Sequence, residues 1–321
     1  MALVIIPLSA AIFMASLREV HSARTVAPPG GRFVPAGDVA LFVQELGPVD
    51  GVPVLLVHGT GAWSETWRDT MTRLAQAGFR AIAVDLPPFG YSDRPATAAY
   101  DKHAQGKRIL AALDGLGIDR AILVGHSFGG GPTVEAALLA SDRVRALVLV
   151  DAALSVREAG AQAPVPSGAG LLAIVPVRDA LVATFLTNPL FTRKLLQTFV
   201  AHPGAATDAR VAVYQRPLNI HGSTHAIGQW LPALLAPASA AASEDPASYR
   251  GLTMPVFIIW GDLDTITPLG QGERLAKITP GAQLSVMRNV GHIPQIEDAA
   301  RFNELLASIL LAVNSRSRNE P

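Results

Sequence analysis

The sequence predicts an α/β protein: a mainly parallel eight-stranded twisted sheet with helices on both faces and an inserted helical cap. Apolar runs rich in β-branched residues alternate with longer segments of helical periodicity, which is the pattern of a parallel sheet covered on both faces. Residues 152–250 break this alternation, because their apolar residues recur at helical spacing. Hydrophobic residues make up 50% of the chain, which is ample for a large buried core.

Each predicted strand corresponds to a short apolar run. Residues 32–35 and 39–45 predict an opening hairpin, and six further strands are predicted at 54–57, 80–86, 121–124, 146–150, 256–260 and 283–287. Helices are predicted between and after them, at 64–77, 101–116, 132–140, 270–278 and 298–313.

The chain therefore divides into four predicted parts. Residues 1–31 hold an apolar N-terminal anchor or signal and a linker, 32–151 the first part of the core, 152–250 the helical cap, and 251–321 the second part of the core. Alanine, serine and proline dominate residues 236–246, which predicts a linker that returns from the cap to the core.

The charge balance and the missing cysteines exclude several classes of function. Lysine plus arginine equals aspartate plus glutamate, at 26 each, so there is no net field to attract nucleic acid. A chain without cysteine has no disulfides, no thiolate zinc site and no cysteine nucleophile. A small, mainly apolar molecule is the expected partner, and no motif indicates a cofactor or a metal.

The N-terminal segment predicts membrane association. Residues 2–17 are uncharged and are followed by Arg18, Arg24 and Arg32. The segment is shorter than the ~20 residues that span a bilayer comfortably, and it lacks the basic start of a secretory signal. We expect an uncleaved N-terminal anchor, with export after cleavage near Ser22 or an apolar arm packed on the body as the alternatives. Three arginines do not decide the side of the membrane.

The strongest local signal is a buried strand that runs directly into G-x-S-x-G. Residues 121–130 read Ala-Ile-Leu-Val-Gly-His-Ser-Phe-Gly-Gly. A serine at so sharp a strand-to-helix turn has a strained backbone, and Gly125 and Gly129 allow the strand and the helix to approach each other. Its hydroxyl then lies at a helix N-terminus, where negative charge is favoured. The motif predicts Ser127 as a nucleophile.

A serine nucleophile requires a histidine base and a carboxylate that orients it, here in the chain order serine, acid, histidine. His292 follows the last predicted strand, in Val-Gly-His-Ile-Pro, and is the expected base. Three carboxylates are candidates for the acid. Asp262 and Asp264 follow the strand at 256–260, and Asp151 ends the strand at 146–150.

A second glycine-containing turn supplies candidate oxyanion donors. Residues 54–61 form a strand that ends in His58-Gly59-Thr60-Gly61. We expect the backbone N–H groups of Thr60 and Phe128 to bind the oxyanion, and His58 to brace the loop by hydrogen bonds.

These motifs together resemble the α/β-hydrolase superfamily, in its capped branch of esterases, carbon–carbon hydrolases and dehalogenases. The resemblance covers residues 33–313 and also includes the family's D-x-P-G-x-G-x-S loop at 85–92, with Pro88 in place of a glycine, G-x-x-D at 261–264, and GH-x-P followed by Glu297. It implies Asp264 as the acid, because the family's G-x-x-D pattern places the carboxylate there. Asp262 is then expected to support the turn or to cap the following segment, and Asp151 is expected to be structural, although some relatives place the acid at its position.

The resemblance also narrows the chemistry. Serine rather than aspartate at the elbow favours acyl chemistry over displacement at a saturated carbon. Hydrolysis of a small, mainly apolar carboxylic ester is expected first; the alternatives are hydrolysis of a carbon–carbon bond in a ring-cleavage diketone, or a non-catalytic ligand receptor of the same fold.

The remaining candidates concern the pocket and the other histidines. Trp63 and Trp230 are expected to contact the substrate, and the apolar cap residues Phe185, Leu186, Phe191, Tyr214 and Leu231 are expected to pack the cap or line the pocket. His126 is expected to pack rather than act as a base. His221 and His225 stand four apart without an H-E-x-x-H motif, so surface or pocket positions are expected rather than a metal site.

Overall fold

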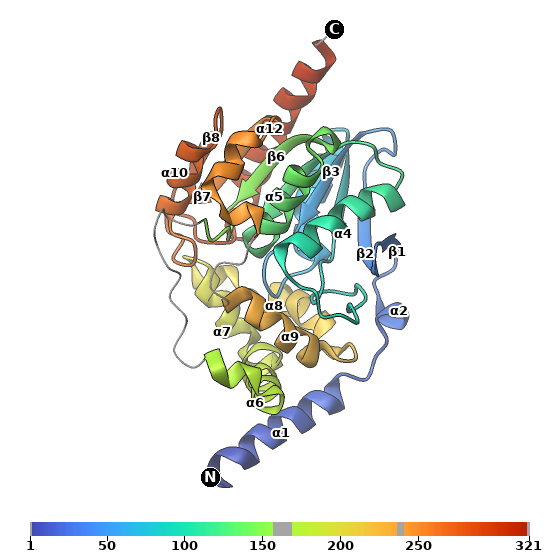
Figure 1. Cartoon of the computed structure of the whole chain (residues 1–321), viewed down its shortest axis with the longest axis vertical. Helices are drawn as coiled ribbons and strands as arrows, with labels where there is room; N and C mark the ends of the chain where they lie inside the picture. Colours follow the sequence, from blue (N-terminus) through green and yellow to red (C-terminus); the bar gives the residue numbers. More distant parts are fainter. Residues whose placement is uncertain (1, 157–168, 236–240, 320–321) are drawn as a thin grey trace.

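The sheet predicted from the sequence is present in the structure, a computed structural model that describes residues 2–156, 169–235 and 241–319 (Figure 1). Its eight strands are ordered β1-β2-β4-β3-β5-β6-β7-β8. The pairs β1–β2 and β2–β4 are antiparallel, and the other neighbouring pairs are parallel. The strands are β1 Gly31–Ala36, β2 Val39–Leu46, β3 Val52–Val57, β4 Phe79–Val84, β5 Ala121–His126, β6 Val144–Val150, β7 Val256–Gly261 and β8 Gln283–Met287.

Helices cover both faces of this sheet. Alternate residues of a strand point to opposite faces, and in the central strands both sets are apolar. Leu55 and Leu123 lie in one buried cluster with residues of α4 and α5, whereas Leu56 and Val124 lie in a second cluster with residues of α3 and α12. Burial on both faces is the physical reason for the continuous apolar runs. The helices of the core are α3 Arg68–Gln76, α4 Lys102–Gly115, α5 Gly130–Leu139, α10 Leu269–Ile278, α11 Pro294–Glu297 and α12 Ala299–Asn319.

The fold class predicted from the sequence is confirmed, and the differences are local. The helix expected at 64–77 is divided into a 3₁₀ turn at Ser64–Trp67 and α3. The helix expected to start at residue 132 begins at Gly130, directly after the turn that holds Ser127. The four-residue helix α11 was not expected, because a single turn is too short to show a helical period.

A layer of helices lies between β6 and β7 in sequence and beside the lower end of the sheet in Figure 1. It comprises α6 Val175–Leu181, the π-helical turn η5 Val182–Leu186, α7 Pro189–Phe199, α8 Asp208–Gln215 and α9 Ser223–Leu235. We call these helices the cap. Of the linker predicted at 236–246, residues 236–240 lie outside the described residues, and Ala242–Glu244 form a 3₁₀ turn.

The N-terminal segment begins with α1, Ala2–Arg18, which packs against α6 and η5 of the cap and precedes the short α2, Ala23–Val26 (Figure 1). The end of α1 and the residue after it are tied to the chain around α9. Arg18 Nε donates to the carbonyl of Leu218, in the 3₁₀ turn Arg216–Asn219, at 3.2 Å, and the Glu19 carboxylate accepts from the Thr224 N–H of α9 at 3.1 Å. Among the described residues, no helix is both long and apolar enough to cross a membrane.

Candidate active site

Ser127 lies in the sharp turn between β5 and α5, and its backbone takes the left-handed conformation with φ of 50°. The two flanking glycines are required there. A Cβ on Gly125 would lie 2.6 Å from Thr133 Oγ1, and a Cβ on Gly129 would lie 2.6 Å from the His58 carbonyl oxygen. The turn therefore has the strained, closely packed geometry that the G-x-S-x-G pattern predicts.

The imidazole of His292 connects Ser127 to Asp264. His292 Nε2 lies 2.8 Å from Ser127 Oγ, and Nδ1 lies 2.8 Å from Asp264 Oδ2. All three side chains are buried. The structure thus brings together the three residues predicted as nucleophile, base and acid, from the loops after β5, β7 and β8, with the connectivity of a Ser-His-Asp triad.

The Asp264 carboxylate is held by three further hydrogen bonds. The N–H groups of Ile266 and Thr267 donate to Oδ1 at 2.8 and 2.9 Å, and the Thr267 hydroxyl donates to Oδ2 at 2.6 Å. Burial by itself raises the pKa of Asp264, but the hydrogen bonds and the charge of His292, together with Thr267, outweigh it and lower the pKa below its ordinary value. Asp264 is therefore ionised, as the acid of a triad must be.

Backbone contacts fix the loop that carries His292. The His292 N–H donates to the Phe199 carbonyl at 3.0 Å, and His126 Nε2 donates to the His292 carbonyl at 2.8 Å. The Glu297 carboxylate accepts from the N–H groups of Gly291 at 2.5 Å and Ala201 at 2.6 Å. Burial lowers the pKa of His126 to about 3, with the charge of His292 adding to the effect, so His126 is a neutral donor that braces this loop, where the sequence predicted only a packing role.

The predicted oxyanion loop packs directly on the serine turn. A Cβ on Gly59 would lie 2.7 Å from His126 Nδ1 and 3.0 Å from Ser127 Cβ, so glycine allows this close approach. His58 Nδ1 donates to the Gly59 carbonyl at 2.8 Å, and Nε2 accepts from the Leu86 N–H at 2.9 Å. These bonds are the bracing predicted for His58, whose pKa burial lowers to about 4. Oxyanion binding by Thr60 and Phe128 itself stays a prediction.

A family model for the alpha/beta hydrolase fold matches residues 52–299. This chain belongs to the α/β-hydrolase family. It is 33% identical over 297 residues to 2-hydroxymuconate semialdehyde hydrolase of Pseudomonas sp. (strain CF600), which covers 88% of this chain and 94% of that protein.

Solved structures agree with this assignment of the fold. The meta-cleavage product hydrolase from Pseudomonas fluorescens IP01 is 29% identical, with a TM-score of 0.69 over 88% of this chain and 98% of that chain. A bacterial membrane phospholipase A is 22% identical, with a TM-score of 0.69 over 99% of this chain and 94% of that chain. At that identity the second likeness shows the fold alone.

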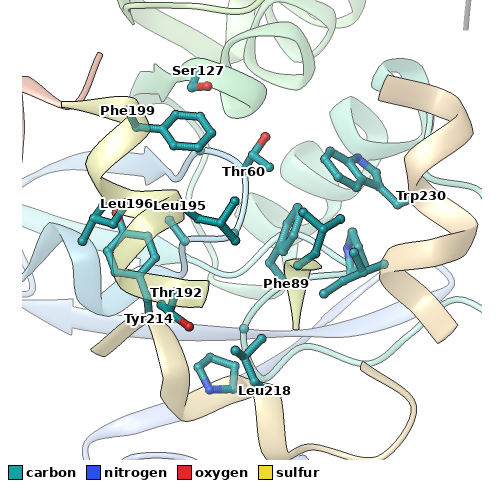
Figure 2. A pocket seen from close by; sticks show the side chains of 18 of the residues that line it. Thr60, Phe89, Ser127, Thr192, Leu195, Leu196, Phe199, Tyr214, Leu218 and Trp230 are labelled. Atoms are coloured by element: carbon teal, nitrogen blue, oxygen red, sulfur yellow. The ribbon is translucent and has the colours of Figure 1, made fainter. Parts of the chain in front are cut away.

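A cavity of about 250 Å³ in this α/β hydrolase lies between the cap and the Ser127 turn (Figure 2). Apolar side chains, many of them leucine or aromatic, form most of its wall. Figure 2 shows Thr60 and Phe199 close to Ser127, with Tyr214 and Leu218 at the far end and Trp230 at one side. The wall is therefore mainly apolar, and its polar residues include Arg94, Thr192 and Ser223 besides Ser127 and His292.

The two tryptophans predicted to contact substrate lie in different places. Trp230 lines the cavity, and its ring packs edge-on against Phe89 and Phe128 at centroid distances of 4.9 and 5.5 Å. The prediction for Trp63 is wrong in its placement. Trp63 is 0% exposed, packs against Tyr91 and donates its indole N–H to the Val213 carbonyl at 2.8 Å, away from the cavity.

The other predicted cap residues also divide between wall and surface. Leu186, Tyr214 and Leu231 line the cavity, whereas Phe185 and Phe191 pack against each other at 5.8 Å and are 50% and 38% exposed.

The remaining polar candidates have other partners. Asp262 accepts from the Asn289 N–H at 2.6 Å and so supports the turn, which is one of the two roles expected for it. His225 is exposed and lies 2.7 Å from Asp179, and His221 is also exposed. Asp151 is fully buried beside Asp264.

Two residues that organise the site were not assigned from the sequence. Thr267 holds the acid, and Arg94 lines the cavity beside Phe89 and Gly90. The role of Thr267 could have been predicted from its position alone. It stands three residues after Asp264, where a hydroxyl can donate a hydrogen bond back to a carboxylate in the same loop. Nothing in the sequence pattern distinguishes Arg94 from the other arginines.

Proposed function

We propose that this α/β hydrolase cleaves a carbon–carbon bond of a 2-hydroxy-6-oxo-dienoate, the substrate class named for its relatives, with Ser127 as nucleophile, His292 as base and Asp264 as acid. The observation that carries the proposal is the hydrogen-bonded chain from Ser127 through His292 to Asp264, in a chain 33% identical to a 2-hydroxymuconate semialdehyde hydrolase. This class takes precedence over the ester that the sequence favoured, because the relatives point to it.

The reaction follows from the geometry in two steps. Ser127 Oγ gives its proton to His292 Nε2 and attacks the 6-oxo carbon, while the N–H groups of Thr60 and Phe128 bind the oxyanion. Before a carbon–carbon bond can break, the substrate must have moved its 2-hydroxyl proton to C5, which gives the 2,6-dioxo-3-ene. As the oxyanion then collapses, the C5–C6 bond breaks, its electron pair is delocalised through C3=C4 onto the 2-oxo group, and the fragment takes the proton from His292. Water activated by His292 then releases the acid from Ser127.

The charge of the cavity supports a substrate with one anionic end. Among the wall residues that the structure describes, Arg94 is the only lysine, arginine, aspartate or glutamate. Its guanidinium donates to the Gly90 carbonyl at 3.1 Å, and its Nε–H is buried without a hydrogen-bond partner among the described residues. A substrate carboxylate would be attracted by the charge of this guanidinium, since guanidinium groups form strong charge-assisted hydrogen bonds with carboxylates.

A paired assay tests this proposal. Wild-type protein should turn over 2-hydroxymuconate semialdehyde, and Ser127→Ala should lose nearly all of that activity. Arg94→Met should raise the KM for this anionic substrate by ~10-fold or more and leave the KM for p-nitrophenyl butyrate, a neutral ester, nearly unchanged. The exposed Arg250 provides the matched control, Arg250→Met. Efficient turnover of the ester alone would reject the proposal.

That rejecting outcome defines the second candidate, hydrolysis of a mainly apolar carboxylic ester by the same residues. The observation that favours it is the wall itself, in which Leu195, Leu196 and Phe199 of α7 face Leu231 and Leu234 of α9. An acyl chain would fill this space without any charged partner.

We also propose that α1 binds a lipid surface. Its described part exposes Phe13, Met14 and Leu17 at 60%, 61% and 57%, although such side chains are ordinarily buried. At 17 residues and ~1.5 Å per residue it is about 26 Å long, which suits insertion into the interface rather than a full crossing. The contacts that Arg18 and Glu19 make with the chain around α9 hold it in place.

Flotation of the full chain with phospholipid vesicles tests this second proposal. Replacing Phe13, Met14 and Leu17 by serine should reduce the bound fraction more than ~10-fold, because about 1 kcal/mol of apolar transfer is lost at each half-inserted side chain. Val49, which is 83% exposed and distant from α1 in sequence, provides the control Val49→Ser. Equal flotation of the triple variant and the control would refute the proposal.

A further inference from the structure

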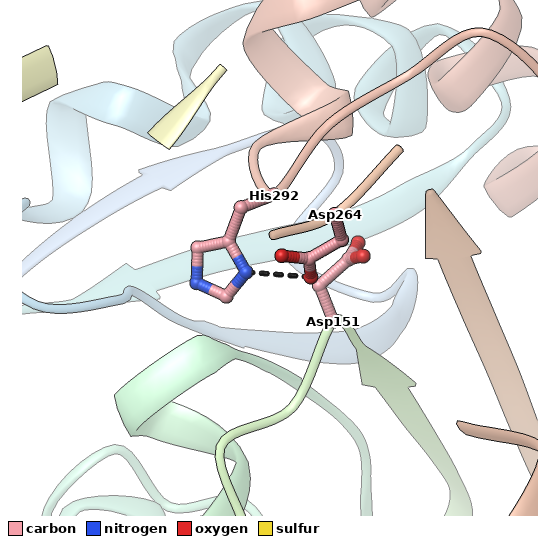
Figure 3. A group of neighbouring side chains, drawn as sticks. All are labelled: Asp151, Asp264 and His292. Atoms are coloured by element: carbon pink, nitrogen blue, oxygen red, sulfur yellow. Dashed lines mark hydrogen bonds and ion pairs between the residues drawn. The ribbon is translucent and has the colours of Figure 1, made fainter. Parts of the chain in front are cut away.

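A second buried carboxyl lies against the acid of the site. Asp151 follows β6 directly, is 0% exposed and has a left-handed backbone with φ of 42°. One oxygen of each carboxyl and one ring nitrogen of His292 lie within 4.8 Å of one another (Figure 3). Such strain at a non-glycine residue persists only where the surroundings enforce it.

The two carboxyl oxygens of Asp151 differ in their hydrogen bonding. Oδ1 accepts a hydrogen bond from the Gly261 N–H at 2.9 Å, which ties the end of β6 to the end of β7. Oδ2 is buried and has no hydrogen-bond partner among the described residues. A buried carboxylate oxygen without a hydrogen-bond partner is unfavourable. If Oδ2 is protonated, it can instead donate a hydrogen bond to a neighbouring acceptor.

The charged groups around Asp151 favour the protonated form. Asp264 from the loop after β7, His292 from the loop after β8 and Glu297 from α11 face it, and His292 is already paired with Asp264. Burial raises the pKa of Asp151 well above its ordinary value, and the negative charges of Asp264 and Glu297 raise it further. The Asp264 carboxylate is the acceptor within reach of an Asp151 proton.

We propose that Asp151 and Asp264 form a carboxyl pair that holds a single negative charge, with Asp151 as a positioning residue whose O–H donates to Asp264. In the wild-type protein Asp264 carries the charge and faces His292, while the donated hydrogen bond limits the orientations of its carboxylate. When Asp264 is made neutral, Asp151 loses its proton and supplies the charge that His292 requires. The inference rests on the proposed role of these residues in hydrolysis.

Two variants of Asp151, one of Asp264 and one double variant test the carboxyl pair. The readouts are kcat, KM and the rate at which a fluorophosphonate modifies Ser127. Asp151→Asn should stay within ~3-fold of wild type, because an amide N–H donates in place of the carboxyl O–H. Asp151→Ala should lose ~10-fold or more in kcat with KM unchanged, because the acid loses its donor. Asp262→Asn is the control, since this carboxylate supports the neighbouring turn and pairs with Arg288.

The decisive comparison is between Asp264→Asn and the double variant with Asp151→Asn. Replacing the triad aspartate by asparagine costs ~10⁴-fold in kcat in a serine protease. In this protein the loss of kcat in Asp264→Asn should be ~10- to 100-fold smaller than this value, because Asp151 supplies the charge. The double variant should show the full ~10⁴-fold loss of kcat. The single variant should also lose activity as the pH falls through the pKa of Asp151, a dependence that a merely structural residue would not produce.

Equal activities of Asp264→Asn and the double variant would overturn the inference, as would wild-type activity in Asp151→Ala. If Asp151→Ala does not fold, the first comparison still decides. A wild-type chain inert toward the fluorophosphonate and both substrates would instead reject the proposed hydrolase function. The protonation of Asp151 would then be tested by the pH dependence of folding stability alone.

Discussion

Replacing Glu297 by alanine tests how the loop that carries His292 is held. The variant leaves the N–H groups of Gly291 and Ala201 without their carboxylate acceptor, at present 2.5 and 2.6 Å away. Hydrogen bonds to a charged acceptor are worth ~1.5–3 kcal/mol each, and the lower end applies here because the half-buried side chain lets water compete. The free energy of unfolding should therefore fall by ~3 kcal/mol, and by about half as much in Glu297→Gln, which keeps one acceptor oxygen.

Thermal denaturation followed by circular dichroism measures this effect. An unfolding entropy of ~2.1 cal/mol/K per residue over 321 residues gives ~0.7 kcal/mol/K, so Tm should fall by about 4–5 °C in Glu297→Ala. The matched control is Glu304→Ala, in which an exposed glutamate loses only its surface ion pair with Arg73 and Tm should not change. Equal Tm values for the two variants would refute the reasoning.

Three further predictions concern side chains that surround the site. Thr267→Val removes the hydroxyl that donates to Asp264, so kcat/KM should fall by ~10-fold, while Thr267→Ser should keep most of the activity; equal activities would show that the hydroxyl is not used. Trp230→Ala, at a position 2% exposed, should lower the free energy of unfolding in urea by ~3–5 kcal/mol and Trp230→Phe by much less; a loss under ~1 kcal/mol would contradict the tight packing on Phe89 and Phe128. Asp151→Asn should gain stability relative to wild type as the pH rises, because burial raises the pKa of Asp151 and the native wild type holds a proton that the unfolded chain releases above pH ~4. The gain is at most ~1.4 kcal/mol per pH unit up to the native pKa, and urea titrations at pH 5 and pH 8 that give the same difference would contradict a raised pKa.

The sequence predicts the fold well where burial of a strand or helix produces a regular pattern of apolar residues. Strands such as β5 and β6 are apolar on both faces because helices cover both, so their runs are unambiguous. The Ser127 turn can also be predicted from the sequence, because neighbouring atoms lie so close to Gly125 and Gly129 that neither position has room for a Cβ. These constraints are local, and a single chain segment shows them completely.

Features that depend on contacts between residues far apart in the sequence cannot be predicted in this way. Trp63 and Trp230 are both large apolar residues, and only the tertiary structure directs one to a closed cluster and the other to the cavity. The partner of Asp151 was likewise hidden, because the strand order that places β6 beside β7 brings together residues more than a hundred positions apart. The substrate class also depends on which side chains the cap turns inward, and residue spacing alone does not decide this for Arg94.

The most direct test of the central claim is to treat the protein with a fluorophosphonate and locate the adduct by peptide mass spectrometry. The hydrogen bonds from Ser127 to His292 and from His292 to Asp264 predict a single stoichiometric adduct on Ser127, absent in Ser127→Ala and formed far more slowly in His292→Ala. An unmodified Ser127, or modification that proceeds equally fast without the imidazole, would contradict the account.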